Sequence, residues 1–456
     1  MITRLRAKNF KSWKDTKELR LAPLTGLFGT NSSGKTSILQ VLLMLKQTVE
    51  SPDRKQVLYT GDYRDLVDLG TFFDFIYGHQ PGVSLLLSLS WDLPKPLVIN
   101  DPEKRNAQLY NIKSLSFSTS IHEESNRPVV ERFAYQFNGH CFGMTRKDSD
   151  RNAEKDRYDL IHESYNAKRV QRGRAWPLPA PVKCYGFPDE ATGYYQNTGF
   201  LPDFVLSFER LFSRLAYLGP IRQYPERSYV WAGDSPENVG RDGELTIPAL
   251  LASRTQGKTI SRGRGKHRQT VEERVALWLR EMELIQSFSL KPIAENRKDY
   301  EVRMRKTATS PEVLITDVGF GVSQILPVLV LCYYVPEGSI ILLEQPEIHL
   351  HPSVQSSLAD VLIDVVKNRN IQVIVESHSE HLLRRLQRRI AEEVIAADAL
   401  ALYFCRIDNG ESKIDRLNVD EEGNITNWPP GFFGDEMGDL IAMSEAAFKR
   451  ERAGRS

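Results

Sequence analysis

Apolar and polar positions follow different spacings along the chain, and each spacing predicts a different element. A short apolar run at 24–28 predicts a strand, and a glycine-rich turn follows it. The apolar positions after this turn recur at helical spacing: Ile38, Val41, Leu42 and Leu45. From about residue 57 to 142, short runs of β-forming residues separated by Gly, Pro and Asn predict an antiparallel sheet.

The last third of the chain has the pattern of an α/β fold. Apolar runs at 340–343 and 371–375 flank a segment with one apolar face. Continuous apolar strands that alternate with helices predict a parallel sheet covered on both sides. Two polar, charge-dense stretches, 146–176 and 254–268, predict surface loops. The chain has no internal repeat and no sustained heptad, so we expect no long coiled coil.

Residues 29–36 read Gly-Thr-Asn-Ser-Ser-Gly-Lys-Thr, the GxxxxGK[ST] pattern of a phosphate-binding loop. Its glycines let backbone N–H groups turn toward a β-phosphate, Lys35 reaches the β and γ oxygens, and Thr36 coordinates magnesium. ATP and Mg²⁺ are the predicted cofactors. The predicted nucleotide-binding residues here are Asn31, Ser32, Ser33, Gly34, Lys35, Thr36 and Ser37. The alternative, a glycine-rich loop that only caps a helix, is disfavoured by the strand before it and the amphipathic helix after it.

The first apolar strand of the last third ends in two polar residues with different chemistry. Glu344 can hold a magnesium-bound water, so Thr36 and Glu344 are the predicted metal ligands. Gln345 takes the usual position of a general base, but a glutamine can only orient water and cannot accept its proton. We expect slow hydrolysis unless another carboxylate helps, and the candidates are Glu347, Glu376 and Glu380. A buried strand that ends in a polar turn is the alternative.

A histidine follows the second apolar strand, where an imidazole can contact a γ-phosphate. The predicted catalytic residues are Glu344, Gln345, Glu347 and His378. A hydrogen-bonded structural histidine is the alternative reading of this position. Zinc is a further alternative, suggested by His349, His351, His378 and His381. No cysteine and no clear third-ligand spacing accompany these histidines, which disfavours zinc.

Together these segments resemble the ABC-type ATPase heads of the SMC and RecF clan. Within that clan the chain is similar to compact ATPases like the ATPase half of the overcoming-lysogenization-defect (OLD) nucleases. The resemblance rests on the phosphate loop and on residues 5–13, 317–324, 344–352 and 376–379. It implies an α/β P-loop fold of ABC-ATPase type, with a mostly parallel core sheet, a flanking antiparallel β lobe and a helical insertion. The Glu-Gln pair at 344–345 departs from the family's usual Asp-Glu, which argues against rapid turnover.

The resemblance also implies that two chains sandwich ATP. Residues Gly321, Ser323 and Gln324 are similar to a signature loop, which in that family lies far from its own phosphate loop and caps a γ-phosphate bound to a second chain. Ser323 opens an apolar helix, so its hydroxyl and the helix N-terminus are suited to an anion. Residues 349–352 would lie at the dimer seam. The residues implied to border the nucleotide from the start of the chain are Lys8, Asn9 and Lys11.

Composition narrows the possible partners. The 60 Lys and Arg balance 59 Asp and Glu, so any basic surface must be local. Four arginines follow His381 at helical spacing: Arg384, Arg385, Arg388 and Arg389. With 254–268 they could contact nucleic-acid phosphates or an acidic protein, and a solvated helix face is the alternative. Four scattered cysteines and the lack of a signal region or a long apolar run indicate a cytoplasmic protein with no membrane partner.

We expect four regions. They are an N-terminal ATPase lobe with the phosphate loop and antiparallel sheet (1–145), an insertion or helical region with basic loops (146–310), a C-terminal ATPase lobe with the signature, Walker B and histidine loops (311–395), and a cap or docking tail (396–456). The aromatic, Pro- and Gly-rich segment 427–436 is either a cap on the core or a docking surface. The tail carries no DxD pair, so we expect no fused nuclease.

The sequence favours an ATP-operated switch. We expect a slowly hydrolysing ATPase that forms a homodimer or higher homo-oligomer around ATP and regulates a separate effector, a nuclease or toxin. Its place in bacterial anti-phage defence is implied by the resemblance alone. One alternative is a DNA repair or recombination ATPase that acts on DNA. Another is a metal-dependent nuclease with these candidate carboxylates: Glu347, Glu376, Asp435 and Glu436.

Overall fold

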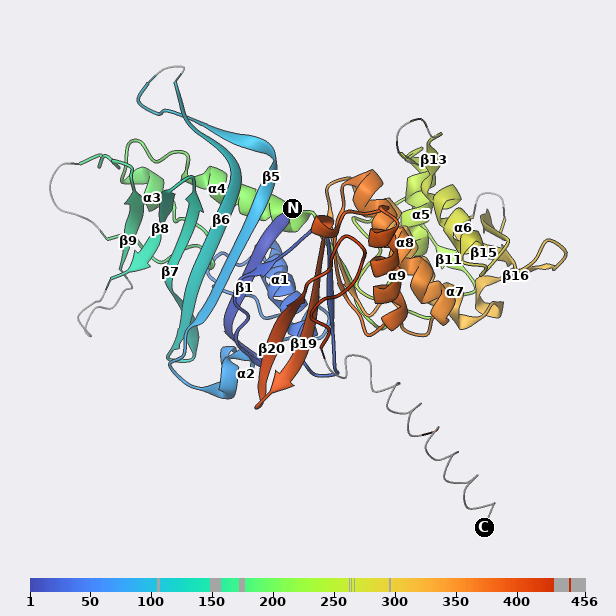
Figure 1. The fold of residues 1–456 in the computed structure, drawn as a ribbon. Coiled ribbons are helices and arrows are strands. Elements are labelled where there is room, and N and C mark those ends of the chain that lie inside the picture. The colour runs from blue at the N-terminus through green and yellow to red at the C-terminus, as the bar shows by residue number, and fades with distance from the viewer. Residues whose placement is uncertain are drawn as a thin grey trace, which may run out of the picture.

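The computed structural model describes residues 1–104, 107–147, 157–171, 177–261, 263, 265, 267–294, 297–429 and 443. A sheet that we call the core sheet lies near the middle of the molecule (Figure 1). A large antiparallel β lobe lies on one side of it, and a group of helices lies on the other.

Six strands form the core sheet, in the order β10-β17-β18-β4-β19-β20. All neighbours from β10 to β19 are parallel, and the last pair is antiparallel. The strands are β10 (Leu215–Leu218), β17 (Ile340–Glu344), β18 (Gln372–Glu376), β4 (Leu24–Gly29), β19 (Leu400–Asp408) and β20 (Glu411–Leu417). The order places the carboxyl ends of β17, β18 and β4 next to one another. The region expected as a helical insertion, 146–310, therefore supplies the edge strand β10 of this sheet.

The larger, eight-stranded sheet is antiparallel throughout, in the order β2-β1-β5-β6-β7-β8-β9, with β3 paired to β1. Its strands are β1 (Ile2–Phe10), β2 (Trp13–Asp15), β3 (Leu19–Arg20), β5 (Leu85–Asn100), β6 (Gln108–Glu124), β7 (Arg127–Phe137), β8 (His140–Arg146) and β9 (Tyr158–Glu163). The molecule is thus a mixed α/β structure with several sheets, and among the described strands parallel pairing is confined to the core sheet.

Apolar side chains cover both faces of the core sheet. Successive residues of a strand point to opposite faces, so Leu342 packs with α1 and the antiparallel lobe while Leu343 packs with the later helices. Helices on the lobe side are α1 (Lys35–Glu50), α2 (Phe72–Phe75), α3 (Glu190–Gly193) and α4 (Leu201–Ser213). The later helices are α5 (Thr246–Thr255), α6 (Val271–Glu281), α7 (Phe320–Tyr334), α8 (Pro352–Arg369) and α9 (Glu380–Ala391).

Small sheets of short strands lie on the same side of the molecule as the later helices (Figure 1). One small sheet contains β11 (Tyr229–Val230), β14 (Ser287–Pro292), β15 (Asp299–Arg305) and β16 (Glu312–Leu314). A second pairs β12 (Thr259–Ile260) with β13 (Gln269–Thr270). Within the described ranges, single-turn 3₁₀ helices lie at Tyr77–His79, Ile315–Asp317 and Ala397–Ala399. Among the described residues, no helix is both long and apolar enough to cross a membrane.

Candidate nucleotide site

Two glycines shape the predicted phosphate loop between β4 and α1. Gly34, the residue before α1, has φ 90°, and a Cβ there would lie 2.7 Å from the Trp13 Nε1 atom. Gly29 has φ 136°, and a Cβ there would lie 2.0 Å from the carbonyl oxygen of Cys405 on β19. Both positions need glycine because neither the backbone angle nor the space admits a side chain. The loop therefore presses against β2 and β19, which fix its shape.

The side chain of Lys35 is held inside the site. It is 3% exposed, and its ammonium donates to the carbonyl oxygens of Gly29 (3.2 Å) and Thr30 (2.8 Å). The Glu376 Oε1 atom lies 4.0 Å from the Lys35 Nζ atom. Burial lowers the pKa of Lys35, and the nearby carboxylate opposes this shift. A phosphate carries more negative charge than the two carbonyl oxygens, so it can replace them as the partner of the ammonium.

A cavity of about 340 Å³ opens over the loop. Its lining residues are Asn31, Ser32, Ser33, Gly34, Lys35, Thr36, Gln345, Glu376 and His378. The structure thus brings the phosphate loop together with two of the predicted catalytic residues, Gln345 and His378. Ser37 is buried on α1 and lines no part of this cavity.

Glu376 belongs to this cavity, although sequence reasoning named it only as a possible helper carboxylate and as a candidate of the nuclease alternative. It is 1% exposed and ends β18, in register with Glu344 at the end of β17. The Thr36 hydroxyl donates to the Glu376 Oε1 atom at 3.0 Å. Burial, followed by repulsion from Glu344, raises the pKa of Glu376 to about 7, although Thr36 and Lys35 oppose the shift. The sequence signal for this residue was its position at the end of the second buried strand of the last third, whereas the pairing of that strand with β4 is seen only in the structure.

The raised pKa of Glu376 predicts a pH-dependent stability. The folded state holds this proton more tightly than the unfolded chain, whose glutamate titrates near 4.5, so the stabilisation is complete below pH 4.5 and is lost as pH rises through about 7. Glu376→Gln should therefore match the wild type near pH 4 in the free energy of unfolding and exceed it at pH 8, by up to about 3 kcal/mol. Metal-free melting curves at both pH values check this, with Glu380→Gln as the control. An equal difference at both pH values would contradict the shift.

Glu344 is held beside the cavity and does not line it. The Tyr217 hydroxyl on β10 donates to the Glu344 Oε2 atom at 2.7 Å. Burial raises the pKa of Glu344, and Tyr217, Arg222, Arg241 and Lys11 oppose this shift. Sequence reasoning found no role for residues 217–222, because no pattern shows that β10 joins the sheet beside β17.

Arg222 is a buried cation that the predicted site did not include. It is 5% exposed, and its Nε and Nη1 atoms have no hydrogen-bond partner within the part of the chain that the structure describes. Burial lowers the pKa of Arg222 to about 10, and the nearby Tyr217 and Glu344 oppose this shift. Arg222 therefore offsets part of the negative charge that Glu344 and its neighbours place at this edge of the sheet.

Glu347 binds the backbone of the loop that carries His378. The backbone N–H of His378 donates to the Glu347 Oε1 atom at 2.6 Å, and burial raises the pKa of Glu347. Glu347 does not line the cavity, so it positions His378 from behind. Burial lowers the pKa of His378, and the positive charge of Lys35 adds to this shift. The lowered pKa favours the neutral form of the imidazole that lines the cavity.

The residues implied near the start of the chain make contacts of their own and do not line the cavity. Asn9 donates its side-chain amide to the carbonyl oxygen of Ser84 at 2.8 Å, and Lys11 donates to the Gln40 Oε1 atom on α1 at 2.6 Å. Lys8 pairs with Asp15 and Leu86 through the backbone. Their binding to nucleotide stays a prediction.

The predicted signature loop lies apart from this cavity. Within the described residues, none from 319–324 lines it. Ser323 is the fourth residue of α7, and its hydroxyl donates to the Phe320 carbonyl oxygen at 2.7 Å, so the side chain contacts its own helix. A Cβ added to Gly321 would lie 3.9 Å from the carbonyl oxygen of His349, and the Phe320 and His349 rings lie 5.2 Å apart. The signature and the predicted seam are therefore neighbours in one chain. The Gln324 side chain is buried.

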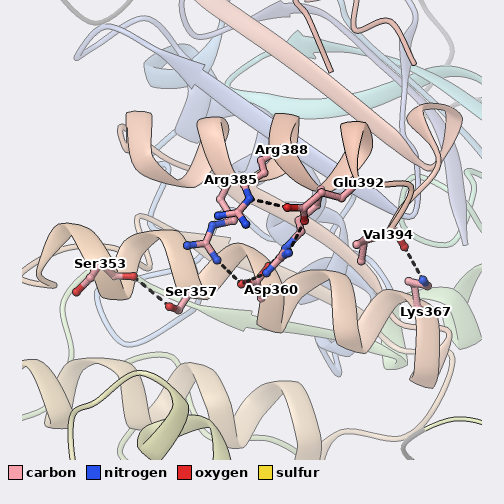
Figure 2. A network of polar contacts seen from close by, with 9 residues as sticks. Ser353, Ser357, Asp360, Lys367, Arg385, Arg388, Glu392 and Val394 are labelled. Atoms are coloured by element: carbon pink, nitrogen blue, oxygen red, sulfur yellow. Dashed lines mark hydrogen bonds and ion pairs between the residues drawn. The ribbon is translucent and has the colours of Figure 1, made fainter. Parts of the chain in front are cut away.

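The arginines of α9 pair with acids of the same chain. Arg385 forms an ion pair with Asp360 of α8 at 2.6 Å, and Arg388 forms one with Glu392 at 2.7 Å. Figure 2 shows both pairs. Arg389 also binds Asp360, at 2.6 Å. In the second basic segment, Arg254 pairs with Glu272, whereas residues 262, 264 and 266 lie outside the described residues. These contacts support the reading of α9 as a structural helix face.

Two further predictions can be placed. Among the described residues, no group of three or more His, Cys, Asp or Glu is arranged to hold a metal ion, which argues against the zinc alternative. In the aromatic tail, Trp428 stacks with the Arg384 guanidinium at 4.7 Å. Residues 430–436, including Asp435 and Glu436, lie outside the described residues.

The strand, the glycine-shaped loop and the cavity together define a P-loop protein. Residues 1–164 and 267–383, well over half of the chain, match the AAA ATPase domain family, and the chain belongs to this family. Membership supports ATP binding and ATPase activity. Residues 395–442 match a second family, described as a protein of unknown function (DUF3696). No curated protein gives a significant match.

Solved structures that resemble the chain include three SMC head domains. The head domain from Thermotoga maritima is 12% identical, with a TM-score of 0.40, and the match covers 92% of this chain and 99% of that one. An SmcHead bound to the C-winged helix domain of ScpA is 12% identical, with a TM-score of 0.43 and coverage of 92% and 98%. The Pyrococcus furiosus head with an extended coiled coil, bound to the C-terminal domain of ScpA, is 10% identical, with a TM-score of 0.44 and coverage of 91% and 96%.

Proposed function

We propose that the chain is an ABC-type, slowly hydrolysing ATPase that acts as an ATP-held switch for a separate effector protein. The observation that carries this proposal is the cavity in which a buried Lys35 and the phosphate loop face Gln345 and His378. The effector role and a place in anti-phage defence follow from the resemblance to OLD-type ATPases. No contact of the described arginines favours DNA as the partner.

The residues at the loop fit magnesium. Thr36 offers a hydroxyl and Glu376 a carboxylate within one cavity, with Glu344 beside it, and Mg²⁺ prefers oxygen ligands, one or two carboxylates among them. One oxygen of Glu376, Oε2, makes no hydrogen bond of normal geometry within the described residues. When bound, the ion neutralises phosphate charge.

The chain's own groups explain why turnover should be slow. The Gln345 backbone N–H donates to the Glu376 carbonyl oxygen at 2.9 Å, which holds its side chain at the cavity with φ 44°. Its amide can orient water but cannot take its proton. His378, whose lowered pKa favours the neutral form, can donate a hydrogen bond to a phosphate oxygen, and Lys35 supplies positive charge.

We further propose that ATP joins two copies through the signature loop. Ser323→Arg should leave ATP binding by the monomer unchanged, because Ser323 lies outside the cavity. It should abolish ATP-dependent assembly, because a long cationic side chain at the proposed contact would block closure of the two chains. Light scattering with and without ATP measures this. The matched control is Ser357→Arg on α8, where the native hydroxyl donates to the Ser353 carbonyl oxygen on an exposed face. Unchanged assembly of the Ser323 variant would refute the signature assignment.

A further inference from the structure

Glu376 and Thr36 meet at the base of the cavity. Their oxygens lie 3.0 Å apart, joined by the hydroxyl proton. Two neighbouring ligands of an octahedral ion with metal–oxygen distances of 2.0–2.1 Å lie about 2.9 Å from each other. This is also an ordinary hydrogen-bond distance, so the separation is compatible with two ligands of one magnesium ion once the hydroxyl proton points away from the carboxylate.

Glu344 is less free to take this role. Its Oε2 atom accepts the Tyr217 hydroxyl at 2.7 Å, and its side chain does not line the cavity. Glu376 lines the cavity, and its Oε2 atom makes no hydrogen bond of normal geometry within the described residues. A buried carboxylate is stabilised by each donor or cation near it; the Gln345 side chain is one such group, and a cation or its bound water would be another.

The charges around Glu376 point to the same partner. Glu344 and Glu376 stand side by side in register at the ends of β17 and β18. Lys35 is the nearest cation to Glu376, at 4.0 Å, and its ammonium also serves two carbonyls of the loop. A divalent cation beside Thr36 would reduce the repulsion between the two carboxylates and leave Lys35 for the phosphates.

We propose that Glu376 supplies a carboxylate ligand, direct or through one water, to the magnesium ion that accompanies ATP. This inference rests on the proposed function, and it assigns to the end of β18 a role that sequence reasoning gave to Glu344 at the end of β17. It also gives a reason why a glutamate lies two residues before His378. Glu376 then couples the metal to the loop that carries the histidine.

The test compares metal-free and metal-assisted nucleotide binding. A fluorescent, non-hydrolysable ATP analogue is titrated into the purified full chain in EDTA and in saturating Mg²⁺, and the ratio of the two dissociation constants gives the gain due to metal. Glu376→Gln should reduce this gain about tenfold or more. Binding in EDTA should stay equal or become tighter, because a negative charge near the phosphates is removed. Glu392→Gln is the matched control, because its carboxylate pairs with Arg388 at 2.7 Å and does not line the cavity.

The outcomes separate this inference from the proposed function. An unchanged gain in Glu376→Gln, or an equal loss in the Glu392 control, would overturn the inference and leave ATP binding intact. Failure of the wild type to bind the analogue under either condition would overturn the proposed function and this inference with it. Glu376→Ala also removes the carboxylate, and the same criteria apply to it if the glutamine variant does not fold.

Discussion

Replacing Lys35 with alanine is expected to abolish ATP binding, with a loss of affinity of at least about 100-fold. The ammonium is buried in the cavity, where charge-assisted hydrogen bonds to phosphate oxygens are stronger than in water. Its loss also leaves Glu376 without its nearest cation, so repulsion of the phosphates grows. Isothermal titration of the purified variant with ATP measures the effect.

Lys46→Ala is the matched control for this experiment. Lys46 is a buried lysine of the same helix, but its ammonium binds Glu50 and the Phe212 carbonyl oxygen away from the cavity. Once its folding is verified by circular dichroism, this variant should bind ATP as the wild type does. Retained affinity in Lys35→Ala, or equal loss in both variants, would refute the phosphate-loop assignment.

Gln345→Glu should raise the rate of ATP hydrolysis, by about 100-fold, because it restores a general base at the edge of the cavity. The backbone can accept the change, since glutamate and glutamine adopt φ 44° equally well. The new carboxylate would lie near Glu344 and Glu376, whose repulsion raises its pKa, so the gain should be larger at alkaline than at acidic pH.

Steady-state phosphate release across pH 6 to 9 measures this gain. Gln345→Ala serves as the control, because it removes the orienting amide without adding a base, and it should show no increase. A rate that falls in Gln345→Glu would mean that the glutamine participates in the reaction through its amide.

The sequence was sufficient for the parts of the site that depend on local chemistry. Residues 29–36 specify a turn that only glycine can make at positions 29 and 34, and the apolar runs at 340–343 and 371–375 form the buried strands β17 and β18. His378 and Gln345 line the cavity because each follows the end of one of these two parallel strands. Buried strands and the helices that cover them could thus be predicted from periodicity.

The sequence could not show which strands lie next to each other in the core sheet. The strand β10 has four buried apolar residues, yet only its place beside β17 brings Tyr217 to Glu344. In the same way, Glu376 reaches Thr36 because β18 lies between β17 and β4. From the sequence alone, the arginines of α9 could form a basic surface. In the structure, Asp360 of α8 lies beside two of them and pairs with both (Figure 2). The contacts of Tyr217 and Glu376 join segments that are far apart in sequence.

Steady-state ATP turnover by the purified chain, alone and with duplex DNA, is the sharpest test of the ATP-held switch, with Lys35→Ala as the blank. We expect slow turnover that the Lys35 variant lacks and that DNA does not change. Turnover that survives in Lys35→Ala, or that DNA stimulates strongly, would contradict the switch, and strong stimulation would point to a DNA-repair type of ATPase.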